Sequence, residues 1–447
     1  MGDGAAPGPP GEAAPWRLRL AALLALTAFL AWALSACLVG LDAERTRDDG
    51  GPLGLPDRLH NPGWLTPDND EGPRGRAAVV MNGSQFPYVG LGDTNAAALV
   101  GPGGDRMTER QGRDEWHPGE DLLLSPDGTR TVSPAGRSGY AASVDVQDLR
   151  TGRHREVPMP GAAPADGEFV PSGWSVLAWM PDGDGLVLAG PAGGLGVLDL
   201  ATGTFQRVAD HAAGLVPGSA VAVRGDGRRI AYVVEGQLVV VDVADGWTAL
   251  QATLPPGAQL GGKAAWSPDG ESVAVSVPSG PPPARRWTFR LVDASTGALR
   301  PAAFPTVGDA VTLRAVGWRA GDRVVAIAYR PEDYATQPTD TDTGFAVVRR
   351  ADLVEVTAGA SSARTLLRPP WQTLAMDVAQ QAAASGLTFT SPDPPPVHLG
   401  RATSAVVGLA SAALLLAVLR RLVLLLARLL DGPAASPVTT PVVAISD

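Results

Sequence analysis

Residues 266–275 read WSPDGESVAV, in which a short polar turn is followed by a run of alternating apolar residues. Pro268 fixes its own φ near the value that the first corner of a β-turn requires, and Gly270 accepts a positive φ without a Cβ clash. After the turn, Val273 and Val275 alternate with Ser or Ala, which is typical of a strand with one face in a core. The pattern predicts a β-hairpin in which a tight Asp-Gly turn joins two antiparallel strands.

This pattern recurs along the chain at steps of roughly 43 to 55 residues, which is the length of a propeller blade repeat. Copies of the turn phrase lie at residues 122–128, 177–183, 221–227, 266–270 and 316–322. A second turn of the form Asp-x-x-x-Gly follows each of the first four copies, at 148–152, 199–203, 242–246 and 293–297. Each unit therefore predicts four antiparallel strands, the blade of a β-propeller.

A weaker repeat precedes these copies in residues 77–110, where the apolar stretches 77–82 and 96–100 predict two strands. The chain is therefore predicted to be all-β, a six-bladed β-propeller, with five or seven blades as alternatives. The unit W-S-P-D-G, V-A-V and D-x-x-T-G resembles the WD40-like (PD40-type) repeat of the TolB family over residues 77–370. The resemblance implies a propeller fold and a role in the cell envelope. Residues 42–76 are too few for the α/β domain that precedes the TolB propeller, and TolB is a soluble periplasmic protein.

The first apolar segment, residues 20–41, contains no charged residue and is long enough to cross a bilayer. Residues 18–41 are predicted to form a transmembrane helix or a lipoprotein signal. The stretch LSAC at 34–37 fits a lipobox, in which Cys37 would carry the lipid. Because the apolar run continues past Cys37, the uncleaved anchor is preferred, and lipidation of Cys37 is the alternative.

A second apolar segment, residues 402–421, is predicted to form another transmembrane helix. Arg420 and Arg421 mark its expected cytoplasmic end, because an arginine at the bilayer centre costs about 2.5–3.5 kcal/mol. The positive-inside rule then predicts that both termini are cytoplasmic and that the propeller is extracytoplasmic at the cell membrane. The other expected segments are a disordered cytoplasmic tail (1–17), a linker (42–76), a short helix with a Pro-rich linker (371–401), and an interfacial helix with a disordered tail (422–447).

Composition narrows the class of partner. The formal net charge is −10, and no basic stripe runs through the propeller region, so nucleic acid is not an expected partner. Lys263 is the only lysine, and this arginine bias with abundant Gly and Pro indicates a high-GC bacterial source. Cys37 is the only cysteine, which excludes an internal disulfide framework and a thiolate metal site.

Candidate metal chemistry is sparse. The segments 68–72 and 340–344 carry the Asp-x-Asp-x-Gly spacing of calcium loops. Their potential ligands are Asp68, Asp70, Asp340 and Asp342. Neither segment has the closing glutamate of an EF-hand, so a solvated acidic loop is the stronger interpretation and no cofactor is predicted. No histidine pairs with another at metal-ligand spacing.

The repeated side chains are predicted to have structural roles. The turn aspartates Asp127, Asp182, Asp226 and Asp269 are expected to hold their own turns rather than to form a catalytic cluster. The repeated tryptophans Trp179, Trp266 and Trp318 are expected to pack between blades. A propeller peptidase would need a Gly-x-Ser-x-Gly elbow in a following α/β domain, and the sequence shows neither. The chain is therefore predicted not to be an enzyme.

The predicted function is a non-catalytic interaction or sensing scaffold at the cell surface, with the membrane and another cell-surface protein as partners. One alternative is an enzyme, or a sugar- or calcium-binding propeller, that uses the channel mouth. Another is a TolB-like component of an envelope machine. Inward-facing polar residues drawn from several blades at one end of the channel would favour the ligand-binding alternative.

Overall fold

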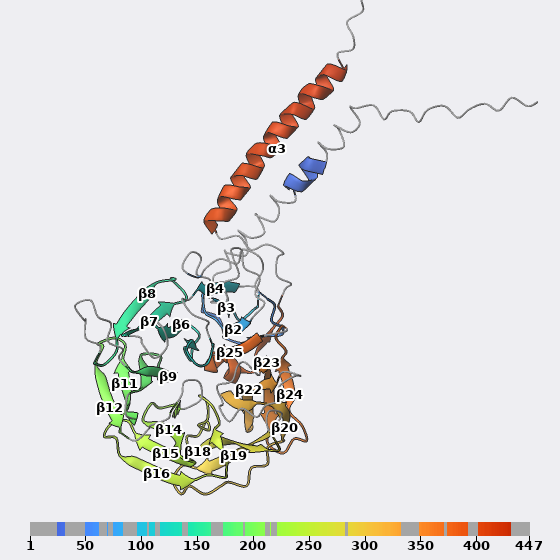
Figure 1. Cartoon of the computed structure of the whole chain (residues 1–447). Coiled ribbons are helices and arrows are strands. Elements are labelled where there is room, and N and C mark those ends of the chain that lie inside the picture. Colours follow the sequence, from blue (N-terminus) through green and yellow to red (C-terminus); the bar gives the residue numbers. More distant parts are fainter. Residues whose placement is uncertain are drawn as a thin grey trace, which may run out of the picture. The chain divides into compact units, whose positions relative to one another are not determined.

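The chain contains two compact units, residues Ala43–Gly400 and a second unit made of Met1–Asp42 with Arg401–Asp447. The larger unit holds six four-stranded antiparallel sheets arranged as blades around a ring (Figure 1). This is the six-bladed propeller that the sequence predicted. The residues described by the computed structural model are 25–31, 50–61, 69, 75–83, 96–104, 107–111, 117–135, 142–161, 173–190, 193–210, 215, 221–281, 285–331, 348–370, 373–391 and 401–430.

Five blades are built from consecutive strands. Blade 2 contains β5 (Leu123–Leu124), β6 (Arg130–Pro134), β7 (Ser143–Asp148) and β8 (His154–Pro158). Blade 3 contains β9 (Ser175–Trp179), β10 (Gly185–Ala189), β11 (Leu195–Asp199) and β12 (Phe205–Ala209). Blade 4 contains β13 (Val221–Val223), β14 (Arg229–Val234), β15 (Gln237–Asp242) and β16 (Thr248–Thr253). Blade 5 contains β17 (Gln259–Leu260), β18 (Ser272–Ser279), β19 (Arg285–Asp293) and β20 (Val307–Ala310). Blade 6 contains β21 (Thr312–Arg319), β22 (Arg323–Pro331), β23 (Val348–Thr357) and β24 (Arg364–Leu367).

Blade 1 closes the ring with strands from both ends of the propeller. Strands β2 (Val79–Gly83), β3 (Ala96–Val100) and β4 (Met107–Gln111) confirm the weak first repeat, and β25 (Thr373–Val378) supplies the fourth strand. β25 pairs antiparallel with β2, so that residue 79 lies opposite residue 378. Residues 373–378 belong to the stretch that was expected to form a short helix (372–386), and for them this expectation is wrong. Helix α2 begins only at Gln380 and ends at Ser385.

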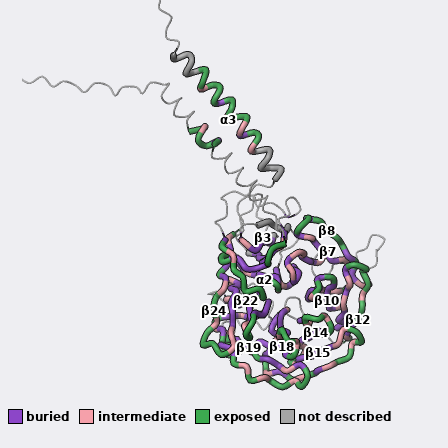
Figure 2. The backbone as a smooth tube through the Cα atoms, turned by 180° about the vertical axis from the view of Figure 1, so that it is seen from behind, coloured by how far each residue is buried: buried purple, intermediate pink, exposed green. Residues whose placement is uncertain are grey.

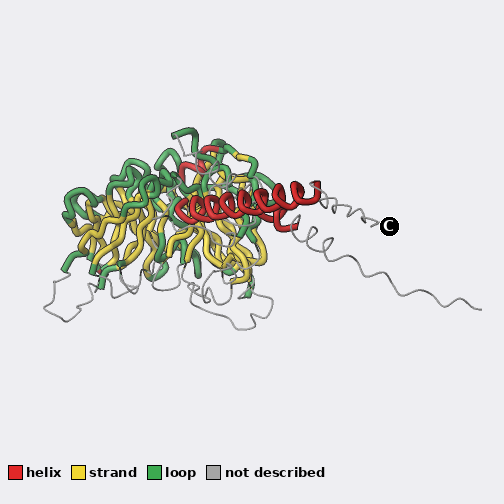
Figure 3. Tube along the Cα trace, turned by 90° about the horizontal axis from the view of Figure 1, so that it is seen from above, coloured by secondary structure: helices red, strands yellow, loops and turns green. Residues whose placement is uncertain are grey.

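Burial follows the position of a strand within its blade. The inner and middle strands are largely buried, whereas the outermost strands, such as β8, β12 and β16, are more exposed (Figure 2). In the edge-on view the strands cross the thickness of the ring, and turns and loops form its two faces (Figure 3). The apolar face of each sheet is thus covered by the next blade, and the loops remain available for contacts.

Neighbouring blades are joined by a repeated tryptophan hydrogen bond. The indole N–H groups of Trp179, Trp266 and Trp318 donate to backbone carbonyl oxygens of the preceding blade, or of the loop that follows its innermost strand, at 3.2, 3.1 and 2.7 Å. All three side chains are buried. The predicted packing of these tryptophans between blades is confirmed. Each indole ring is buried in an apolar interface, and its N–H group is hydrogen-bonded there.

The segment expected as a plain linker contributes to the propeller. β1 (Leu55–Pro56) pairs in parallel with β26 (Thr388–Phe389). Leu53, Leu55 and Leu59 are buried in the same core as blade 1. The apolar side chains explain this outcome. A solvated linker would expose them to water, whereas packing against blade 1 buries them.

The second unit contains helix α3 (Arg401–Leu430) and a helical stretch at residues 25–31. Most of the expected span 18–41 lies outside the described residues. Within the part of the chain that the structure describes, no helix has the combination of length and apolarity needed to cross a membrane. Large apolar side chains are nevertheless exposed on α3, among them Leu409, Leu416 and Val423.

Candidate functional site in the central channel

The innermost strands β5, β9, β13, β17, β21 and β25 come from all six blades, and residues on or next to them line the centre of the ring. Two neighbouring spaces lie there. The inner cavity has a volume of about 30 Å³, and a wider space, here called the mouth, has about 520 Å³. Pro181, Val223 and Gln380 line both spaces, so the two are adjacent.

Lys263 and Asp377 form an ion pair in the inner cavity, with Nζ 2.6 Å from Oδ1. The Asp377 side chain is 2% exposed, and its carboxylate also accepts the backbone N–H groups of Leu124 and Val378, each at 2.9 Å. The carboxylate is therefore held by three donors from three parts of the chain. Asp377 reaches the channel because its strand, β25, pairs with β2 and closes blade 1.

Two glycines bring Lys263 to the channel. Gly262 has a φ of +111°, which side chains rarely adopt, and a Cβ there would lie 2.6 Å from the carbonyl oxygen of Ala315. Only glycine permits this close approach of the backbone to β21. The preceding Gly261 donates its N–H to Ala274 and accepts one from Ala315. The irregular backbone ends strand β17 and places Lys263 among the lining residues.

A second buried ion pair lies beside the first. Arg314 on β21 donates to Glu120 at 3.0 Å, and its guanidinium carbon lies 5.2 Å from the ring centre of Tyr329. Burial raises the pKa of Glu120 above its usual value, although the charge of Arg314 opposes this. Burial also raises the pKa of Tyr329 to about 12, so its hydroxyl keeps its proton at neutral pH. Arg314 and Tyr329 line the inner cavity together with Lys263 and Asp377.

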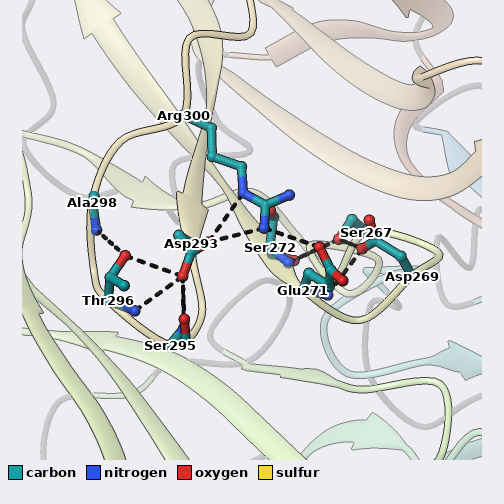
Figure 4. Close-up of polar contacts among 9 residues, drawn as sticks. All are labelled: Ser267, Asp269, Glu271, Ser272, Asp293, Ser295, Thr296, Ala298 and Arg300. Atoms are coloured by element: carbon teal, nitrogen blue, oxygen red, sulfur yellow. Dashed lines mark hydrogen bonds and ion pairs between the residues drawn. The ribbon is translucent and has the colours of Figure 1, made fainter.

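The mouth is bordered by the predicted Asp-Gly turns of blades 4 and 5. Asp226 binds the guanidinium of Arg224, and this hydrogen bond lowers its pKa to about 2. Asp269 accepts hydrogen bonds from Ser267 Oγ at 2.5 Å and from the N–H of Glu271 at 2.9 Å (Figure 4). The hydrogen bond from Ser267 is the main reason why the pKa of Asp269 is also lowered. Both rim carboxylates are thus ionised and engaged within their own turns.

The second turn phrase follows the third strand of its blade and lies beside the first turn phrase, since Ser272 is paired with Asp293. In blade 5, Asp293 accepts hydrogen bonds from Ser295 and Thr296, and Arg300 joins it to Glu271 of the neighbouring turn (Figure 4). These hydrogen bonds, first of all the one from Ser295 Oγ, hold the pKa of Asp293 well below its usual range. The same pattern of backbone N–H groups on an aspartate recurs at Asp148 and Asp199. The aspartates of the second turn phrase, for which no role was predicted, thus accept hydrogen bonds within their own turns.

Some of the site residues predicted from the sequence lie outside the described residues, and the others lie in separate turns. Cys37 and the potential calcium ligands Asp68, Asp70, Asp340 and Asp342 lie outside the described residues. Among the described residues, no group of three metal-binding side chains occurs. The aspartates of the first turn phrase do not form a common cluster, because each accepts hydrogen bonds inside its own turn.

The channel residues were not predicted. Lys263 stood out only as the single lysine, and Asp377 lay in a stretch expected to be helical. Arg314 lies within the mostly apolar inner strand β21, which also contains Thr312 and Arg319, so the strand gave only a weak local signal of an inward-facing charge. The structure thus contains inward-facing polar residues from several blades, the arrangement named above as favouring ligand binding.

No protein-family model and no curated protein matches the chain. Many solved structures are similar to it, among them the following three. Kuenenia stuttgartiensis hydrazine synthase is 16% identical, with a TM-score of 0.35, and the match covers 56% of this chain and 65% of that one. A chain of the mitotic checkpoint complex is 13% identical, with a TM-score of 0.38 and coverages of 71% and 87%. A putative TolB from Agrobacterium tumefaciens is 15% identical, with a TM-score of 0.36 and coverages of 65% and 88%. These likenesses concern the fold alone.

Proposed function

We propose that the chain is a non-catalytic interaction and sensing scaffold, in which a propeller is held at the membrane and displayed outside the cell. The observation that carries the proposal is the closed ring of six blades with loops on both faces (Figure 3). Buried tryptophan hydrogen bonds join its blades, and the turn aspartates are engaged in holding their hairpins. Such a ring presents loops on a rigid support, which suits recognition of another protein.

Partner capture tests the scaffold directly. The full chain, tagged after Asp447 and expressed in its host, is cross-linked in intact cells, and the captured proteins are identified by mass spectrometry. We expect one cell-surface protein to be enriched through cross-links to propeller loops. The matched control is a tagged chain that lacks residues 50–391. Equal enrichment with this control, or no enriched protein, would contradict the scaffold.

Membrane tethering is supported by the exposed leucines of α3 and by the apolar segment 20–41. Arg420 and Arg421 favour a cytoplasmic C-terminus under the positive-inside rule. Protease added to intact, wall-stripped cells is expected to digest the propeller and to spare a tag after Asp447. Digestion of the tag with protection of the propeller would place the scaffold inside the cell.

Cys37 distinguishes the two forms of N-terminal attachment. An uncleaved anchor predicts that the full-length mass persists and that Cys37→Ala changes nothing. A lipoprotein predicts a mature chain that starts at a lipidated Cys37, with processing blocked in Cys37→Ala. Intact mass of the membrane-extracted protein decides between them, and a mass starting at Cys37 would reject the anchor.

A further inference from the structure

Two ion pairs lie at the inner cavity. Lys263, Arg314 and Asp377 line it, and Glu120, which is not among the lining residues, pairs with Arg314 at 3.0 Å. The two cations and two anions therefore balance in charge. A ligand in this cavity would be held by hydrogen bonds from these groups rather than by an excess of positive charge.

Lys263 has donor capacity that its ion pair does not use. Its Nζ is buried and has only the Asp377 carboxylate as a partner among the described residues. An ammonium group carries three N–H donors, and leaving buried donors without acceptors is costly. Asp377 already accepts two backbone N–H groups, and the oxygen atoms of a molecule in the cavity are suitable acceptors for the remaining Lys263 donors.

The volumes set the size of that molecule. The inner cavity, at about 30 Å³, is large enough for one small polar group. The mouth, at about 520 Å³, has the size of a small-molecule site. The rim carboxylates Asp226 and Asp269 are engaged in their own turns, and Trp266 and Trp318 add apolar lining. A ligand body can therefore lie in the mouth while its charged end enters the inner cavity.

We propose that the propeller channel is a binding site for a carboxylate, with Lys263 as the residue that binds its charged end. The carboxylate belongs to a small organic acid or to the C-terminus of a peptide, and its remainder occupies the mouth. The inference rests on the proposed function, since it names the ligand class to which a sensing scaffold would respond. Partner capture in cells and ligand binding to the purified chain can fail separately, so the two proposals remain distinguishable.

Isothermal titration calorimetry on the purified full chain tests the site. The probes are acetate, succinate, trialanine with a free carboxylate, trialanine amide and inorganic phosphate. We expect saturable binding of at least one carboxylate and none of the amide. Tighter binding of trialanine than of the small acids identifies a peptide terminus, and the reverse order identifies an organic acid. No saturable carboxylate binding, or stronger binding of phosphate, overturns the proposal.

Variants locate the binding residue. Lys263→Met is expected to weaken carboxylate binding at least tenfold, and Lys263→Arg is expected to retain most of it. The matched control is Arg290→Met, which removes one positive charge from an exposed position on β19. Equal weakening by Lys263→Met and Arg290→Met would show a general charge effect and reject Lys263 as the anchor.

A measurement on the unmodified protein covers the case in which Lys263→Met does not fold. Lys263 carries the only side-chain amine in this sequence, so an amine-reactive acetylating reagent gives one lysine product. The modification rate of Lys263 is followed by peptide mass spectrometry. A carboxylate that binds in calorimetry is expected to slow modification at least fivefold, whereas chloride at equal ionic strength does not. An unchanged rate at saturating carboxylate overturns the proposal.

Discussion

The turn at Gly270 offers a quantitative test of how the hairpins are held. Gly270 has a φ of +70°, and a Cβ built on it would lie 3.1 Å from Cδ and 3.4 Å from Cγ of Arg224. Gly270→Val places a β-branched residue in a left-handed conformation, which costs about 1–2 kcal/mol. Its methyl groups must also displace Arg224 from Asp226, and this exposed ion pair contributes about 0–1 kcal/mol. The expected loss in the free energy of unfolding is therefore about 1–3 kcal/mol.

Two other glycines separate the causes. Gly183 lies in a turn with the same Pro-Asp-Gly sequence and has a φ of +75°, but nothing lies within 4 Å of its added Cβ. Gly183→Val therefore measures backbone strain alone, about 1–2 kcal/mol. Gly225 also has open space around its Cβ and no positive φ. Gly225→Val is expected to stay within about 0.5 kcal/mol of the original protein.

Urea unfolding of the full chain, followed by tryptophan fluorescence, measures all three variants under one set of conditions. The expected order of destabilisation is Gly270→Val, then Gly183→Val, then Gly225→Val. If Gly225→Val lost as much as Gly270→Val, the left-handed turn would not be the cause of the loss. If Gly183→Val were neutral, the contact with Arg224 rather than backbone strain would dominate.

Three further perturbations address the channel and the blade interfaces. Asp377→Asn leaves the Lys263 ammonium without a counter-charge and should lower the free energy of unfolding in urea by about 3–5 kcal/mol. Adding Lys263→Met to this variant should recover part of the lost stability. If the losses of the two single variants simply added in the double variant, the two side chains would not be coupled. Trp318→Phe removes the 2.7 Å hydrogen bond to a buried carbonyl and should lower the free energy of unfolding by about 1–3 kcal/mol. The control Trp247→Phe, at a residue that is 64% exposed, should leave stability unchanged. Equal losses of stability in the two variants would reject the role of Trp318 at the blade interface. Burial raises the folded-state pKa of Glu120 above 4.5, so the stability of the protein should fall as the pH rises from this value through the raised pKa. Glu120→Gln should flatten the plot of urea midpoint against pH in this range. An equal slope in Glu120→Gln and the original protein would count against Glu120 as the titrating group.

The repeated turns made most of the fold predictable. Asp-Gly turns and alternating valines are local signals, so residues 266–275 indicated their hairpin without reference to other parts of the chain. The inner strand of blade 1 was not predictable in this way. Residues 373–378 lie beside helix-favouring Gln and Ala, and their strand form depends on pairing with β2, almost three hundred residues earlier in the chain.

The channel residues escaped prediction for a related reason. Lys263, Arg314 and Asp377 come from different blades, and only closure of the ring brings them to one cavity. A single sequence shows the residues of each strand but not which inner strands face one another. The glycines at 261–262 were visible, yet the approach of their backbone to β21 is a tertiary feature.

The closing strand β25 also sets the order in which the protein can mature during synthesis. Blades 2 to 6 consist of consecutive strands, so each can form soon after it leaves the ribosome. Strand β2 emerges early but keeps an unpaired backbone edge until residues 373–378 have been translated. The outermost strands lie at the edges of their sheets even in the finished propeller, but β2 has the edge that waits longest for its native partner during synthesis. Chaperone binding, or mispairing between neighbouring nascent chains, would therefore concentrate at this edge.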